Sequence, residues 1–237
     1  MNWGVIFSSA RSGGNLLDGL INKYQNGRAL GEIYGRSYQI QLNERINNKS
    51  VNEYTKDIEA KYQNRYDIII PRFHQIHLRF GFNVGIFDTV FDNFDKKIIL
   101  YRENLLNKQV SFSMVMNTKT WHYSSPNEVL PDYKKYQIYL NKNYMEYLFI
   151  NLRNYYNGII ERYGGDSLFF VKYEDIVESH SITELADWLG LIGYNASVKI
   201  PTRHINPTDD GYKQIINYEE LKHLKLELKK TKYGYRF

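Results

Sequence analysis

The residues with the clearest chemical potential form a loop of small side chains, Ser8–Asn15 (SSARSGGN), between an apolar run and a helical pattern. Such a loop allows several backbone N–H groups to converge on one anion, and the N-terminus of a following helix adds unpaired donors and partial positive charge. Gly13 and Gly14 permit positive φ and close approach of the backbone. Arg11 adds a charged donor for phosphate or sulfate oxygens. The loop therefore predicts an anion site.

Two familiar phosphate motifs are absent from this loop. The spacing G-x-x-x-x-G-K-[ST] of nucleoside-triphosphate P-loops does not occur, and no lysine stands beside the glycines. The dinucleotide fingerprint G-x-G-x-x-G is also missing. Taken alone, the loop is explained equally well by a Ser/Gly turn that joins a strand to a helix.

A second segment, Lys96–Phe112 (KKIILYRENLLNKQVSF), places Arg102 at the end of an apolar run and Ser111 nine residues further on. Ligands of open α/β sheets bind at the carboxyl ends of the strands, so Arg102 and the first loop are expected to share one crevice. An arginine and a serine there can hold a second anionic group. The alternative is an arginine at a strand end and a serine on a helix face, without a ligand.

The elements that must position these residues alternate between strands and helices. Short apolar runs predict strands at Trp3–Phe7, Asp67–Ile70, Asn83–Phe87, Lys97–Tyr101 and Ser167–Val171. Helical spacing predicts a helix from Leu16 to a stop at Gly27, and further helices over Val51–Tyr66, Asn104–Met116, Lys135–Tyr163 (one helix or two), Ile182–Leu191 and Tyr218–Lys230. Apolar strands between helices favour an α/β fold with a central parallel sheet flanked by helices. Without a repeat or linker, residues 1–237 are expected to form a single domain.

The composition of the chain limits the kinds of ligand and partner that are expected. The net charge of +5 permits an anionic ligand, but lysines and arginines are scattered among acidic residues, so no nucleic acid is expected. The absence of cysteine excludes disulfides and thiolate metal sites. No apolar run approaches the roughly 18–20 residues of a membrane span. Trp3–Phe7 is too short for a signal peptide, and a cytoplasmic location without a membrane span is therefore expected.

Together the two anion segments resemble the sulfotransferases that use 3′-phosphoadenosine-5′-phosphosulfate (PAPS) as sulfuryl donor. SSARSGGNLL is similar to the 5′-phosphosulfate loop of that family, whose carbohydrate branch often reads P-R-S-G-[ST]-[TN]-L-L. LYRENLLNKQVSF is similar to the family's 3′-phosphate segment, with the nine-residue interval of bacterial carbohydrate (trehalose and nodulation-type) sulfotransferases. The resemblance implies a P-loop-like sulfotransferase fold, a hydroxyl-bearing acceptor (most simply a saccharide), 3′,5′-ADP as product and no metal.

Weaker matches follow in the family's order, so that the resemblance runs from Ser8 to Leu191. Gly27–Tyr34 (GRALGEIY) resembles the segment that carries the acidic base of trehalose sulfotransferases, and Asn117–Ser125 (NTKTWHYSS) resembles their Trp-His stretch. FFVKYEDIVE and ITELADWLGL resemble the family's R-Y-E-D-L and the short helix after it.

The sequence also departs from the family pattern. Ala10 stands where the family commonly has proline, Gly14 replaces a usual serine or threonine, and Asn83 stands where a lysine is frequent. The carboxy-terminal phosphate loop of the animal enzymes is not recognisable.

The resemblance implies a role for each candidate. The residues expected to bind the donor are Arg11, Ser12, Gly13, Gly14, Asn15, Arg102, Ser111 and Tyr173. Arg11 is also expected to stabilise charge on the transferred group, and Tyr173 to contact the adenine edge. Glu174 and Asp175 are expected to cap the helix that follows them.

The acceptor hydroxyl must lose a proton, so a general base is expected. Glu32 is the first choice through its match to the trehalose enzymes, although a surface glutamate is the ordinary alternative. His122 and His74 are the other candidates, and His122 follows Trp121 in a pair that suits a sugar pocket. His74 and His77 lack an obvious third ligand, so no metal site is predicted.

Two other functions remain open at this stage. A small-molecule kinase would need a lysine in the loop and carboxylates for Mg²⁺, and neither is evident. A module that binds 3′,5′-ADP or PAPS without turnover is conceivable because of the departures at Gly14 and Asn83.

Overall fold

A computed structural model describes residues 1–34, 51–75, 85–118, 137–179, 181–198, 200, 213–224, 226 and 228. His122 and the segment around Asn83 lie outside these residues.

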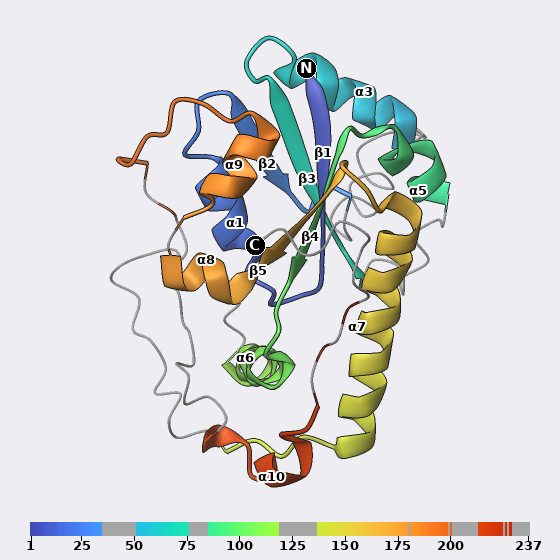
Figure 1. The fold of residues 1–237 in the computed structure, drawn as a ribbon, viewed down its shortest axis with the longest axis vertical. Helices are drawn as coiled ribbons and strands as arrows, with labels where there is room; N and C mark the ends of the chain where they lie inside the picture. The colour runs from blue at the N-terminus through green and yellow to red at the C-terminus, as the bar shows by residue number, and fades with distance from the viewer. Residues whose placement is uncertain are drawn as a thin grey trace.

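A parallel sheet forms the centre of the structure (Figure 1). Its strands are β1 (Asn2–Ser8), β2 (Gly27–Gly31), β3 (Ile68–His74), β4 (Lys96–Tyr101) and β5 (Leu168–Lys172). All four pairings in the order β2-β3-β1-β4-β5 are parallel. The predicted α/β fold with a central parallel sheet is confirmed. Because many α/β folds share such a sheet, the sheet does not by itself specify a sulfotransferase fold.

The sheet has a topological switch point at β1. The chain leaves β1 for β2 and β3 on one side, and then crosses to β4 and β5 on the other. Phe7 is paired with both Phe73 of β3 and Ile99 of β4, so the three central strands end close to the same level. The loop after β1 and the residue after β4 therefore meet at the carboxyl edge, where ligands of open α/β sheets bind.

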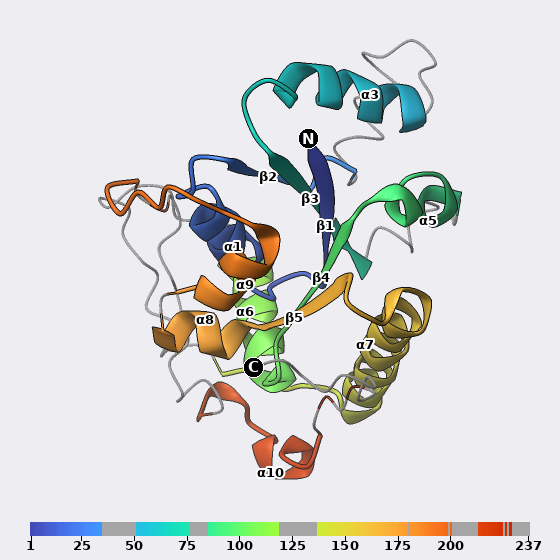
Figure 2. The ribbon, with the colours of Figure 1, turned by 45° about the horizontal axis from the view of Figure 1, so that its top comes forward.

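Helices cover both faces of the sheet. Figures 1 and 2 show α1 (Gly14–Ile21), α8 (Tyr173–Ser179) and α9 (Thr183–Leu189) on one side. The other side carries α3 (Val51–Tyr62), α5 (Gly85–Thr89), the 3₁₀ turn η1 (Phe91–Asn93) and α7 (Lys142–Tyr163). Beyond the carboxyl ends of the strands lie α6 (Leu105–Thr118) and α10 (Tyr218–Leu221).

Strand side chains alternate between two hydrophobic cores. Val5 and Phe7 pack with the aromatic cluster under α5 and α7, whereas Ile6 between them packs with α1 and α9. The same alternation holds for Ile99 and Ile98 of β4. Both faces of the strands are therefore buried, as continuous apolar strands require.

Several predicted boundaries are wrong. The helix predicted from Leu16 to Gly27 ends at Ile21, and Gly27 instead begins β2, a short strand that the sequence analysis missed. The strand predicted to end before Pro71 continues to His74. Both errors come from glycine and proline, which usually interrupt elements but are accommodated here by neighbouring strands.

Other predicted elements have the wrong type or length. Residues 85–87 of the predicted strand Asn83–Phe87 begin the helix α5, because Ile86, Phe87 and Val90 pack together with helical spacing. The helix predicted over Tyr218–Lys230 ends at Leu221. The stretch Lys135–Tyr163 contains one long helix, which begins only at Lys142 behind the N-cap Asn141.

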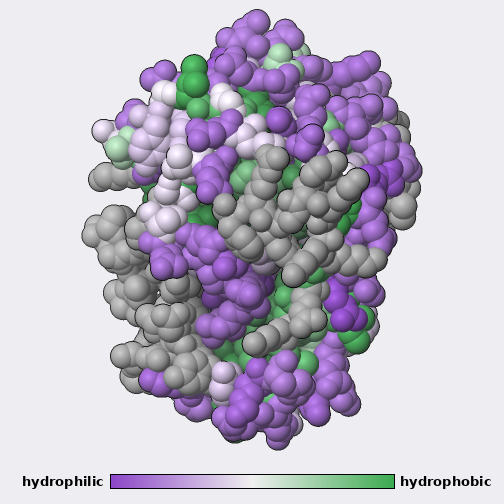
Figure 3. All heavy atoms as spheres, in the orientation of Figure 1, coloured by the Kyte–Doolittle hydropathy of each residue, from purple (hydrophilic) through white to green (hydrophobic). Residues whose placement is uncertain are grey.

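One face of the molecule is mostly polar among the described residues. On the face seen in Figure 3, described side chains are mainly hydrophilic, with small and separate hydrophobic areas. No helix among the described residues has the length and apolar character needed to cross a membrane.

The aromatic core gives a prediction about stability. Phe91 is fully buried, and its ring lies 5.1–5.5 Å from those of Phe7, Phe73 and Phe87. Phe91→Ala should lower the free energy of unfolding by about 3–5 kcal/mol, because it removes apolar area and leaves a cavity. Urea denaturation measures this loss. Ile150→Ala on the exposed side of α7 is the control, and equal effects of the two substitutions would contradict the core assignment.

Candidate functional site

The loop after β1 folds back on itself between Ser8 and Gly14. The Oγ atoms of Ser9 and Ser12 lie 2.7 Å apart, and the N–H of Ser12 donates to the carbonyl of Ser9 at 3.2 Å. Arg11 and Gly13 adopt left-handed backbone conformations, with φ values of 64° and 88°. The left-handed conformation of a non-glycine residue costs of order 1–3 kcal/mol and is typical of ligand-binding loops.

A tyrosine of α7 anchors the base of this loop. The hydroxyl of Tyr156 lies 3.3 Å from the Oγ of Ser9 and 3.1 Å from the carbonyl of Leu100 on β4. Burial raises the pKa of Tyr156 to about 12, so the group stays a neutral donor. The sequence analysis missed Tyr156, since a tyrosine-rich helix gives no signal that singles out one ring.

The structure brings Arg11 of the loop together with Ser111 of α6. The Nε of Arg11 donates to the Oγ of Ser111 on α6 at 3.1 Å, across 100 residues of sequence. Arg102 follows β4, is only 6% exposed, and places its guanidinium 4.6 Å from the ring centre of Tyr173. The same ring packs against Gly13, where an added Cβ would lie 2.2 Å from it. The loop, β4, α6 and α8 therefore converge at one edge.

Glu174 has a different role from the expected one. It lies in the first turn of α8, but its carboxylate accepts hydrogen bonds from the backbone N–H groups of Glu103 and Asn104, at 3.2 and 3.1 Å. It therefore caps the start of α6 and fixes α6 to α8. Asp175 pairs with Lys172 at 3.1 Å.

On the other side of the loop lies a buried arginine that the sequence analysis missed. Arg72 on β3 is 4% exposed. Its Nη1 donates to Asp18 at 2.7 Å, and its Nη2 donates to Asn15 at 2.7 Å and to Glu32 at 3.1 Å. A charge so deeply buried needs such partners, because the interior solvates it poorly. Arg72 thereby connects the loop helix α1 with the predicted base.

Glu32 and His74 lie beside each other at this edge. The Nε2 of His74 is 3.3 Å from the same carboxylate oxygen of Glu32 that accepts from Arg72. Arg72 and His74 share one face of β3 because side chains alternate along a strand. The carboxylate of Glu32 is contacted by the buried Arg72. Because the Glu32 side chain is 41% exposed, it also reaches solvent.

A bulge at the end of β2 directs Glu32 toward Arg72. Ala29 is paired with Ile70 and Gly31 with Pro71, so that Leu30 is left over. Proline has no N–H for the ladder, and a bulge with a glycine at φ 67° accommodates it. The strand turns at Gly31, and Glu32 follows directly.

Two side chains predicted to donate hydrogen bonds to the anion of PAPS also have partners within the protein. The Oδ1 of Asn15 accepts from Arg72, and the hydroxyl of Ser12, 1% exposed, pairs with Ser9. In this structure both stabilise the loop. Gly14 supplies space instead of a donor, since a Cβ there would lie 2.2 Å from the Nη1 of Arg72.

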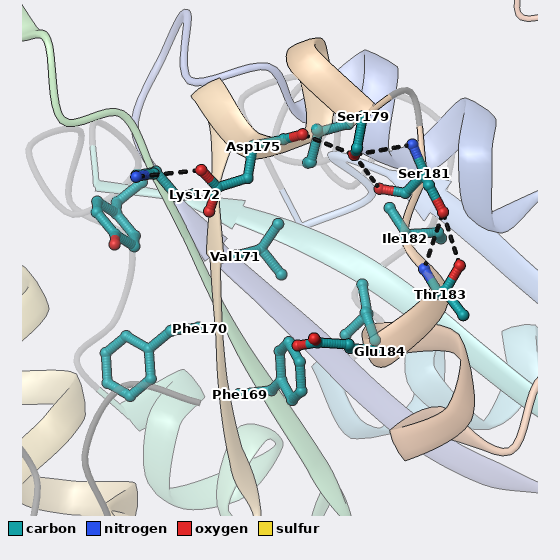
Figure 4. Close-up of a pocket in the computed structure, with 13 residues that line it drawn as sticks. Phe169, Phe170, Val171, Lys172, Asp175, Ser179, Ser181, Ile182, Thr183 and Glu184 are labelled. Carbon is teal, nitrogen blue, oxygen red and sulfur yellow. Dashed lines mark hydrogen bonds and ion pairs between the residues drawn. The ribbon is translucent and has the colours of Figure 1, made fainter. Parts of the chain in front are cut away.

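A cavity of about 270 Å³ lies elsewhere, between the edge strand β5, α8 and the start of α9 (Figure 4). Phe169, Val171 and Ile182 contribute apolar walls, and the ion pair of Lys172 and Asp175 lies beside them. None of the predicted site residues lines this cavity, so the convergent edge is the stronger candidate. Within the described ranges, no cluster of three His, Asp or Glu side chains is placed to hold a metal ion.

Comparison of the chain with protein-family models and with curated proteins finds no match.

Gly14 offers a direct test of the arginine network. Gly14→Ala should displace the guanidinium of Arg72 from Asp18 and Asn15 and lower the free energy of unfolding by about 2–4 kcal/mol, because a buried charge loses its partners. Urea denaturation measures this. Gly158→Ala is the matched control, since its Cβ would meet nothing within 4 Å in the middle of α7, and it should stabilise by about 0.5–1 kcal/mol. An unchanged free energy of unfolding in Gly14→Ala would contradict the arginine network.

Asp18 predicts a pH dependence of stability. Burial raises the pKa of Asp18 from 3.8 to about 6. The positive charge of Arg72 opposes this shift, and the negative charge of Glu32 adds a smaller increase. Its proton is therefore bound more tightly in the folded state. The resulting stabilisation is complete below about pH 4 and is lost as the pH rises through 6.

Asp18→Asn should remove this dependence. Relative to the variant, the parent should lose about 1–3 kcal/mol of unfolding free energy between pH 4 and pH 7, as measured by urea denaturation at each pH. Asp187→Asn on the exposed side of α9 is the control. A constant difference between parent and Asp18→Asn across this range would rule out the raised pKa.

Proposed function

We propose that this chain is a PAPS-dependent sulfotransferase of the P-loop-like sulfotransferase fold, and that its acceptor is a carbohydrate hydroxyl. One observation carries the proposal: Arg11, Arg102 and Ser111 come together beside a glycine-containing strand–loop–helix at the carboxyl edge of a parallel sheet. These are the residues on which the sequence resemblance depends. The contact between Arg11 and Ser111 supports a site that spans two anionic groups of one ligand.

In this proposal the donor lies across the edge of the sheet. The 5′-phosphosulfate is held by the loop and the first turn of α1, where backbone N–H groups and the helix dipole favour an anion. Arg11 neutralises charge on the bridging oxygen and the transferred group. The 3′-phosphate is held by Arg102 and Ser111. Tyr173 is 6% exposed, and its contacts with Gly13 and Arg102 give it a positioning role beside the adenine contact that the resemblance implies.

The reaction needs positioning, charge stabilisation and one proton acceptor. The acceptor oxygen forms a bond to sulfur in line with the bridging S–O bond, which breaks and releases 3′,5′-ADP. The hydroxyl proton passes to the base, for which Glu32 is the first candidate. Arg72 donates a hydrogen bond to this carboxylate from its buried side, His74 lies 3.3 Å from it, and the link from Arg72 to Asn15 connects it to the loop.

Binding of the donor product tests the proposal. By calorimetry, 3′,5′-ADP should bind more tightly than 5′-AMP, because Arg102 and Ser111 contact only the 3′-phosphate. Arg102→Ala should cost roughly tenfold or more for 3′,5′-ADP, the usual range for a charge-assisted hydrogen bond. Arg153→Ala on the exposed side of α7 is the control. Equal affinities of the parent for both nucleotides would refute the proposal, and tight ATP binding with Mg²⁺ would indicate a kinase.

Turnover tests the assignment of the base. Glu32→Gln keeps the size of the side chain and its hydrogen bond from Arg72 but cannot accept a proton. Sulfuryl transfer from labelled PAPS to a saccharide panel should fall by about 10²–10⁴, with 3′,5′-ADP affinity unchanged. If Glu32→Gln keeps the parent rate with chemistry rate-limiting, and His74→Gln or His122→Ala does not, that histidine is the base. A parent that binds 3′,5′-ADP and transfers nothing to any acceptor would indicate a binding module.

A further inference from the structure

A lysine of α6 lies beside the residues proposed to hold the 3′-phosphate. Lys108 is 7% exposed and precedes Ser111 by one helical turn, so the two side chains share a face of α6. Within the described part of the chain, no carboxylate forms an ion pair with Lys108. A buried ammonium without a counter-ion destabilises a folded protein.

The charges that face Lys108 are mostly of its own sign. Burial lowers the pKa of Lys108 to about 7, and the positive charge of Arg102 is the second cause of this shift. Arg11 reaches the same face of α6 through its hydrogen bond to Ser111. The nearby carboxylate of Glu174 lies 3.9 Å from the Nε of Arg102 and is already engaged at the start of α6.

Arg102 is itself incompletely satisfied. Its Nε is buried and has no hydrogen-bond partner among the described residues. Arg11 thus contacts the hydroxyl of Ser111, Lys108 lies one turn before Ser111 on α6, and Arg102 acts electrostatically on Lys108, with the carboxylate of Glu174 beside Arg102. An anion with two negative charges would supply what this cluster lacks.

We propose that Lys108 completes, with Arg102 and Ser111, a site for a phosphate or sulfate dianion, and that Lys108 takes up a proton when the anion binds. This inference rests on the proposed function, in which the dianion is the 3′-phosphate of the donor. The same chemistry accepts inorganic pyrophosphate, so the anion site can be tested apart from the nucleotide. Lys108 would then supply a cation that the sequence lacks where the animal enzymes have their carboxy-terminal phosphate loop.

Lys108→Met is the decisive variant, because methionine is similar in length and uncharged. Calorimetry with 3′,5′-ADP, 5′-AMP and pyrophosphate should show a loss of roughly tenfold or more for 3′,5′-ADP and pyrophosphate, and no change for 5′-AMP. At pH 8, the enthalpy in buffers of different ionisation heat should report uptake of close to one proton per anion by the parent. The difference in proton uptake between the parent and the variant should become small at pH 6, where Lys108 is mostly charged and the titration of the phosphate itself, with a pKa of about 6, contributes equally to both proteins.

Thermal unfolding separates a binding role from a structural one. Without ligand, Lys108→Met should melt at or above the parent temperature, because it removes a buried charge. A lysine kept for structure would instead give a less stable variant with unchanged anion affinity. Lys56→Met on the exposed side of α3 is the control, and should alter neither quantity.

Each outcome decides a different question. If the parent and Lys108→Met bind 3′,5′-ADP equally, the role of Lys108 is refuted and the donor assignment stands. If nucleotides do not bind but pyrophosphate binds in a Lys108-dependent manner, the donor assignment is wrong and the anion site stands. A parent that binds none of the three ligands overturns both.

Discussion

The arrangement of the candidate site depends on one buried cation, the guanidinium of Arg72. β3 lies inside the sheet, so this side chain cannot reach solvent and must be neutralised within the protein. Its partners come from separate parts of the chain: Asn15 and Asp18 from α1, and Glu32 from the turn after β2. The loss of any partner leaves charge in a poorly solvating interior. This requirement fixes α1 and the end of β2 against β3, and it holds an exposed carboxylate in one place.

Because β1 lies between β3 and β4, the loop after it has side chains of different charge on its two sides. Toward β3 the loop meets acidic groups organised by Arg72, and toward β4 it meets the cations of α6 and Arg102. The proposed sulfuryl transfer would use this separation, because a base must face the acceptor while cations hold the phosphates of the donor. The left-handed backbone of Arg11 places its side chain on the cationic side, in contact with Ser111. The strain in the loop is offset by the hydrogen bonds of Ser9, Ser12 and Tyr156.

The sequence was sufficient where the signal was local. An apolar run, a Ser/Gly loop and a helical repeat predicted β1, its loop and α1, and the apolar run before Arg102 predicted β4. Arg72 could not be predicted, since an arginine after Ile-Ile-Ile-Pro has the pattern of a strand end, and its burial follows only from pairing with β2 and β1. The strand β2 was missed for a related reason: two glycines and a bulge remove the alternation that identifies a strand.

Gly14 and Arg72 are best understood as one coupled feature. The sulfotransferases that the loop resembles usually have a serine or threonine at this position, whose hydroxyl can donate to the anion. Gly14 has no such hydroxyl. The structure shows that any Cβ at this position would occupy the space of the Arg72 guanidinium. A side chain at position 14 therefore requires the guanidinium of Arg72 to leave its present place. The chain has no hydroxyl donor at position 14 and has a cation behind the loop, and this cation contacts both Asn15 and Glu32. The departure at Gly14 is consequently compatible with an active site, provided that Glu32 or its neighbour His74 accepts the proton.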